Sequence, residues 1–160
     1  MTTPPHKHHD RVYQRPERLR AKRSGFTTPV IVHKPWGQEE LVILTDRYVA
    51  KILTIRPGHR LSVQYHDHKC ETLRCIGGSG WAYLGTKRSP KKLLKRPFEK
   101  GMILHITPGT VHTYEAKTRL QLFEVSTPEV WDVVRLHDNY GRTTPTRAMK
   151  TTSARKRTTR

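Results

Sequence analysis

The sequence is poor in cysteine, in long apolar runs and in acidic residues, and each shortage excludes a class of protein. Only two of the 160 residues are cysteines, Cys70 and Cys75. They exclude a disulfide framework, and their spacing is neither a redox CxxC motif nor a zinc knuckle. No apolar run approaches the roughly 18 residues of a membrane span, and the polar amino-terminal stretch lacks the apolar core of a signal peptide. We therefore expect a cytoplasmic protein that makes no membrane contact.

Acidic residues are outnumbered, since 13 Asp and Glu face 31 Lys and Arg and the net charge is +18. The excess lies in residues 1–25, 86–100 and 142–160, which carry +5, +6 and +7, while the remainder of the chain is neutral. The two ends also hold too few apolar side chains to offset the entropy of ordering. We predict a disordered basic arm over residues 1–25, one domain over 26–142 in which 86–100 is a basic loop insertion, and a disordered basic tail over 143–160.

Between its ends the sequence has the texture of a β-protein. Short runs rich in Val, Ile, Leu and Tyr are separated by turn dipeptides such as Pro57-Gly58 and Pro108-Gly109. No segment with a helical period of 3.6 residues interrupts them. Eight short strands in one small domain predict a β-sandwich or jelly-roll barrel. The expected strands cover residues 41–44, 48–55, 61–65, 71–76, 81–84, 102–106, 111–116 and 120–126.

Four polar residues have the spacing of a metal site. Gln64 and His66 are two apart in a predicted strand and therefore share a face. A tight turn would bring Glu71 inward on the next strand, and His112 begins another strand after a Pro-Gly turn. Two imidazoles, a carboxylate and an amide oxygen suit a divalent first-row metal, with positions left open for water or substrate. The alternative is that the four residues form a hydrogen-bonded polar core.

The residues around this constellation resemble the motifs of one family. The stretch GHRLSVQYHDHKCETLRCIGG (58–78) resembles the first cupin motif with Gln64 in place of its first histidine, and GMILHITPGTVH (101–112) resembles the second. LSVQYH (61–66) fits the L-S-[LIV]-Q-x-H pattern of phosphomannose isomerases. PWGQEE (35–40) and DVVRLHDNYGR (132–142) resemble segments of the type II mannose-6-phosphate isomerases. The resemblance implies an all-β fold, a single cupin jelly-roll (double-stranded β-helix) barrel.

The resemblance also implies an activity, the interconversion of mannose 6-phosphate and fructose 6-phosphate through an enediol. Zinc best suits the ligand set, and the family permits manganese, cobalt or iron. Lys51 shares the inward parity of Leu53, so burial and a nearby metal would depress its pKa and make it a catalytic base. The alternatives are that Lys51 pairs with a carboxylate such as Glu124, and that His66 or Glu71 acts as the base.

The remaining site residues are assigned by position in the motifs. Arg142 and Arg135 resemble family arginines near the cavity mouth, which would bind phosphate bidentately or neutralise the enediolate. Ser62 is placed like the phosphate-contacting serine of the isomerases. Glu124 is also expected to contact the substrate. Cys75 shares parity with Glu71 and is expected to be an inert buried thiol.

Two functions of other classes remain open. One is a non-catalytic cupin that binds a sugar phosphate through the same residues. The other is non-specific contact of the basic tails with nucleic acid or another polyanion, which would weaken steeply with salt. Cupins that resemble this sequence are commonly dimers, so a homodimer is also expected, with Trp131 packed across its interface or in its own core.

Overall fold

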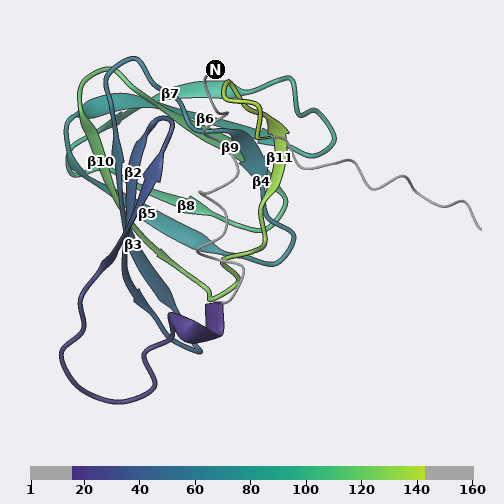
Figure 1. Ribbon diagram of the computed structural model, residues 1–160. Helices are drawn as coiled ribbons and strands as arrows, with labels where there is room; N and C mark the ends of the chain where they lie inside the picture. Colours follow the sequence, from purple (N-terminus) through teal and green to yellow (C-terminus); the bar gives the residue numbers. More distant parts are fainter. Residues whose placement is uncertain (1–15, 143–160) are drawn as a thin grey trace, which may run out of the picture.

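The computed structural model describes residues 16–142, which form eleven β-strands and one short 3₁₀ helix, η2 (Pro16–Arg18) (Figure 1). The strands make two antiparallel sheets, one ordered β1-β2-β3-β10-β5-β8 and the other β11-β4-β9-β6-β7. The all-β prediction is therefore confirmed. The strands are β1 (Val30–Lys34), β2 (Gly37–Leu44), β3 (Val49–Ile55), β4 (Val63–Tyr65), β5 (Glu71–Gly77), β6 (Ser79–Thr86), β7 (Leu94–Glu99), β8 (Ile103–Ile106), β9 (Thr110–Ala116), β10 (Leu120–Ser126) and β11 (Val134–His137).

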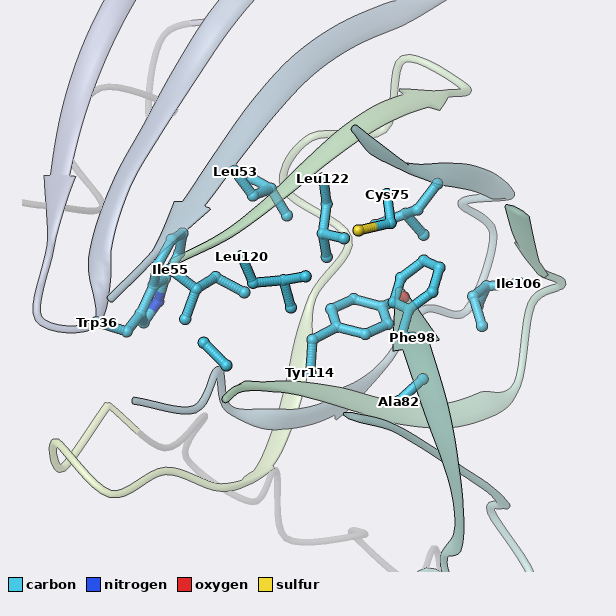
Figure 2. Packing of buried hydrophobic residues seen from close by; sticks show 12 residues of the cluster. Trp36, Leu53, Ile55, Cys75, Ala82, Phe98, Ile106, Tyr114, Leu120 and Leu122 are labelled. Carbon is cyan, nitrogen blue, oxygen red and sulfur yellow. The ribbon is translucent and has the colours of Figure 1, made fainter. Parts of the chain in front are cut away.

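The hydrophobic core lies between the two sheets (Figure 2). Phe98 and Tyr114 from the five-stranded sheet pack with ring centroids 5.9 Å apart and face aliphatic side chains of the six-stranded sheet. Alternation along β10 turns Leu120 and Leu122 into this core. The next inward position of β10 is Glu124, which is also buried, so the interior changes from apolar to charged along one strand.

All eight predicted strands are present, and β1, β7 and β11 are the three that the sequence pattern missed. β7 was missed because it is an edge strand with a single buried residue, Phe98, and therefore lacks apolar alternation. The edge position also tolerates Pro97, which has no N–H to donate to a ladder. The basic segment 86–100 thus forms the turn and second strand of the β6–β7 hairpin. The predicted arm and tail lie largely outside the described residues.

A close backbone approach fixes the start of β2. Gly37 has a φ of +152°, and a Cβ at this position would lie 2.0 Å from the carbonyl oxygen of Thr54 in β3. The adjacent Trp36 is 4% exposed and joins the core. Glycine after the tryptophan therefore lets β2 sit directly against β3. Across the described part of the chain, no helix is long and apolar enough to cross a membrane.

Candidate metal centre and ligand cavity

Three buried side chains from both sheets converge at the polar end of the interior. His66 follows β4, Glu71 begins β5, and His112 lies in β9. Nε2 of His112 is 3.2 Å from Oε1 of Glu71, and Nε2 of His66 is 3.5 Å from Oε2 of the same carboxylate. One ligand atom from each residue lies within 4.8 Å of the other two. The turn between β4 and β5 thus brings Glu71 toward the histidines, as the sequence spacing predicts.

The backbone sets the tautomer of both histidines. Nδ1 of His112 lies 3.0 Å from the carbonyl oxygen of Thr110, and Nδ1 of His66 contacts the carbonyl oxygen of Asp132. A carbonyl only accepts, so each Nδ1 carries a proton, and Nε2 is the ring atom that faces Glu71. Neither buried Nε2 makes a hydrogen bond within residues 16–142. Orientation of this kind is what metal-ligating histidines require, so the residues fit a divalent ion.

Glu71 is ionised in this arrangement. Burial alone would raise its pKa, but the ammonium of Lys69 and the two imidazoles hold the pKa of Glu71 well below its ordinary value of 4.5. Zinc and similar ions bind carboxylates only in the deprotonated form. The site therefore offers two imidazole nitrogens and one anionic oxygen.

Gln64 lies beside this triad. It pairs with His112 across β4 and β9 and lines the same cavity. The hydroxyl of Ser62 donates a 2.8 Å hydrogen bond to Oε1 of Gln64, and Ser62 is itself buried. Ser62 therefore orients the amide, and the ligand role of Gln64 stays a prediction.

A row of buried charges crosses the six-stranded sheet next to the triad. Lys69 contacts Glu71 and lies 2.7 Å from Oε1 of Glu124, while Nζ of Lys51 lies 3.3 Å from Oε1 of Glu39. Cations and anions therefore neighbour each other along the row. Mutual compensation is what allows charges to remain in a buried site.

Without a metal ion, the pKa of Lys51 is shifted in the direction opposite to the one predicted for a lysine beside a metal. Burial lowers the pKa of Lys51, but the neighbouring carboxylates Glu39 and Glu124 outweigh burial and raise it above the ordinary value of 10.5. Lys51 is thus a buried cation at neutral pH. Lys51 instead pairs with a carboxylate, which was the alternative considered from the sequence. Its salt-bridge partner is Glu39, at 3.3 Å.

The arginines at the cavity mouth differ in their contacts. Arg142 makes a bidentate ion pair with Asp138, with Nη2 to Oδ1 at 2.7 Å and Nε to Oδ2 at 3.1 Å. Arg135 lies opposite Gln64 in the β11–β4 ladder. Both arginines line the cavity. Asp138 therefore positions Arg142.

These residues share one cavity of about 560 Å³. Small-molecule sites fall in the range of about 300–1,000 Å³. His112 lies behind the wall and is fully buried. The other predicted site residues line the cavity together: Lys51, Ser62, Gln64, His66, Glu71, Glu124, Arg135 and Arg142.

The chain is similar in sequence to a known protein family. Residues 21–138 match the family model described as mannose-6-phosphate isomerase C-terminal. The chain belongs to this family. The mannose-1-phosphate guanylyltransferase ManC of Salmonella typhimurium is 35% identical over 116 residues, which are 69% of this chain and 23% of that protein. The xanthan biosynthesis protein XanB of Xanthomonas campestris is 30% identical over 128 residues, 77% of this chain and 26% of that protein.

This member of the family spans about a quarter of the length of those curated relatives. Among solved structures, the capsular polysaccharide assembling protein CapF of Staphylococcus aureus matches with a TM-score of 0.61 at 17% identity, over 71% of this chain and 33% of that one. A double-stranded β-helix protein of Klebsiella pneumoniae matches with a TM-score of 0.53, over 76% of this chain and 94% of that one. The predicted single cupin jelly roll is confirmed.

Sequence reasoning missed four residues of this cupin's site. Lys69 was assigned to a turn, although it lies two residues before Glu71 and shares its inward parity. Glu39 alternates with buried Leu41 in β2, a signal that points it inward. Lys34 ends β1, a strand that the pattern did not reveal, and is buried against the cavity. Tyr114 is buried beside Glu71, which together with burial raises the pKa of its hydroxyl well above 10.0.

Two further expectations have different outcomes. Cys75 is fully buried in the core, as predicted from its parity. Trp131 does not pack in the core of its own chain, because it is 58% exposed. Its indole instead borders the ligand cavity.

Proposed function

We propose that this cupin is a metal-dependent sugar-phosphate isomerase that interconverts mannose 6-phosphate and fructose 6-phosphate. One observation carries the proposal: His66 and Glu71 of the triad line a cavity that also holds buried lysines, glutamates and two arginines, with His112 directly behind them. An aldose–ketose exchange needs a proton acceptor near carbon, a proton donor near oxygen and a cation for the phosphate. The cavity contains side chains of all three kinds.

The site would hold a divalent ion through His66, Glu71, His112 and Gln64, and zinc is the ion we propose, with manganese, cobalt or iron as alternatives. When bound, such an ion would polarise the substrate oxygens and stabilise the negative charge of an enediolate. The protein supplies this ion with a preformed donor set, because both Nδ1 protons are already held by backbone carbonyls.

The protonation of Lys51 changes the assignment of the base. A lysine that is charged at neutral pH can donate a proton, so Lys51 would supply its Nζ proton to O1 as the enediol forms and take up the proton of the C2 hydroxyl as the ketose carbonyl forms. Glu124 lies directly opposite Lys51 in the β3–β10 ladder and lines the cavity. We assign to the Glu124 carboxylate the removal of the proton from C2 and its return to C1. Arg135 and Arg142 would hold the phosphate at the mouth.

Proton exchange in D₂O tests this function directly. The full chain is loaded with zinc, cobalt or manganese, incubated with mannose 6-phosphate and followed by NMR. We expect fructose 6-phosphate, or deuterium at C2, with wild type, and a loss of at least about 100-fold with Glu124→Gln. His112→Ala should lose both metal and exchange. Absence of exchange with every metal, in protein that holds one equivalent, would favour the alternative, a non-catalytic sugar-phosphate-binding cupin.

A further inference from the structure

Trp131 occupies a place where a large aromatic side chain needs an explanation. It lies between β10 and β11, borders the cavity and is 58% exposed. Leaving such a side chain in water forgoes the stabilisation that burial of its apolar surface would bring. The other two tryptophans are less exposed, since Trp36 is in the core and Trp81 is half-buried under the ammonium of Lys95.

The backbone beside Trp131 is firmly held. The Asp132 carboxylate accepts hydrogen bonds from the backbone N–H groups of Asp67, His68 and Lys69 at 3.0, 2.6 and 2.7 Å. The carbonyl of Asp132 accepts the Nδ1 proton of His66. One residue therefore ties the segment that carries Trp131 to the metal-binding turn. The backbone that carries the indole is therefore held at a set position relative to the triad.

The cavity next to Trp131 has cationic as well as apolar side chains in its wall. Lys34 and Arg135 line it together with the Asp138-bound Arg142, and the triad lies deeper. A ligand that satisfies both ends carries a phosphate for the cations and hydroxyl or carbonyl oxygens for the triad. The carbon-bound hydrogens of a pyranose ring form an apolar, weakly positive face, which suits the negative face of an indole.

We propose that Trp131 is a binding platform on which the pyranose ring of a sugar phosphate stacks while its phosphate contacts the cationic wall. This inference rests on the proposed function only in taking a sugar phosphate as the ligand. The inference adds that Trp131 alone supplies the affinity for the sugar ring. The affinity for phosphate comes from other side chains. A free phosphate would not contact the indole.

Metal-loaded full chain is titrated with mannose 6-phosphate and, separately, with inorganic phosphate, by calorimetry and by tryptophan emission. We expect mannose 6-phosphate, but not phosphate, to shift the emission to shorter wavelength as Trp131 leaves water. Trp131→Phe should abolish the shift, and Trp81→Phe, the matched control, should keep it. Trp131→Ala should weaken mannose 6-phosphate binding by about 3- to 10-fold and leave phosphate affinity within about twofold.

The outcomes separate this inference from the proposed function. Binding of mannose 6-phosphate by Trp131→Ala as tight as by wild type overturns the platform, whether or not wild type isomerises the sugar. Equal weakening of phosphate and sugar phosphate also overturns it. A dimer in light scattering that becomes a monomer only in Trp131→Ala would place the indole in a subunit interface instead. Normal ring-dependent binding without proton exchange supports the platform and contradicts the isomerase activity.

Discussion

At the scale of single residues, the side chain with the most consequence for the site is Lys69. Its ammonium lies between the buried carboxylates of Glu71 and Glu124, so removing it leaves two anions close together in a medium that solvates them poorly. Breaking a buried ion pair by deleting one partner typically costs about 3–5 kcal/mol. Lys69 thus keeps the carboxylate end of the site charged and folded before any metal arrives.

We predict that Lys69→Met lowers the free energy of unfolding of the metal-free protein by about 3 kcal/mol. A divalent ion bound at Glu71 replaces part of the lost positive charge, so saturating zinc should recover more stability in Lys69→Met than it adds to wild type. Denaturant melts with and without zinc measure both effects. The control is Lys91→Met, which removes an exposed lysine from the β6–β7 turn and should change stability by less than about 0.5 kcal/mol. Equal loss in the two variants would contradict the role given to Lys69.

For single residues, burial could be predicted from alternation along a strand. Ion pairing and pKa could not, because they depend on side chains from other strands. The parity of Lys51, Glu71 and Cys75 placed all three inside, and all three are buried. Without a metal ion, the pKa of Lys51 is raised rather than lowered because it depends on Glu39, which approaches from another strand. Lys69 was missed for a related reason, since its partner Glu124 is 55 positions away in the chain.

At the scale of elements, the segment between β10 and β11 serves as a strap across the metal-binding turn. Asp132 bonds three consecutive backbone N–H groups of that turn. Burial alone would raise its pKa, but the N–H groups of Lys69, His68 and Asp67 outweigh burial and lower the pKa of Asp132 below its ordinary value of 3.8. A depressed pKa in the folded state means that the carboxylate stabilises the fold while it is ionised.

We predict that Asp132→Asn destabilises the protein by about 1–2 kcal/mol at neutral pH, because a neutral amide replaces charge-assisted bonds. The wild-type contribution is complete above the unfolded-state pKa and disappears as pH falls through the lower folded-state value. The difference between the two proteins should therefore shrink between about pH 5 and pH 2. Thermal melts across this range provide the measurement. A difference that does not depend on pH would show that the carboxylate charge contributes nothing.

The junction of β1 and β2 gives a second prediction at this scale. We expect Gly37→Ala to destabilise the protein by about 1–3 kcal/mol, because the new methyl group would meet the carbonyl oxygen of Thr54 at 2.0 Å. Gly58→Ala provides the comparison, since its φ is +75° but nothing lies within 4 Å of the added carbon. It carries backbone strain without a clash. Urea melts should rank Gly37→Ala as the less stable variant, and the reverse order would contradict the close approach.

Whether a strand could be predicted likewise depended on whether its own residues, or only its neighbouring strands, indicate it. The eight predicted strands each carry their own short run of apolar residues. β11 (Val134–His137) has no buried residue, and it forms a strand because it pairs with the edge of β4. β7 likewise depends on β6 for its ladder. Neither strand could be read from its own residues.

At the scale of the whole molecule, the positive charge is concentrated outside the cavity. The β6–β7 hairpin exposes Lys91, Lys92, Lys95 and Arg96, and the Nζ of Lys95 lies 4.2 Å from the centre of the Trp81 ring. The sequence adds basic residues at both ends of the chain. A surface of this kind attracts polyanions without sequence preference, and the attraction weakens with salt.

We predict that the full chain binds a single-stranded oligonucleotide with an affinity that falls steeply with salt, and that the double variant K91E/K92E reduces the slope of log K against log salt by about 2. Fluorescence anisotropy over a salt series measures the slope. K117E/R119E changes the net charge equally at the β9–β10 turn and should have a smaller effect. Identical slopes for the two variants would assign the attraction to net charge alone.

The metal triad takes its three residues from both sheets, and this has a consequence for the order of events in folding. His66 and Glu71 lie at the two ends of the turn that joins β4 to β5, but His112 comes from a strand more than forty positions later, after the β6–β7 hairpin. An ion can therefore find its full donor set only when the two sheets have closed on each other, late in a slow, non-local assembly. Contacts that form after the transition state slow unfolding without speeding folding. Zinc should accordingly lower the rate of unfolding of the native barrel while leaving its rate of folding nearly unchanged. The ion would then stabilise the folded barrel without taking part in the folding nucleus.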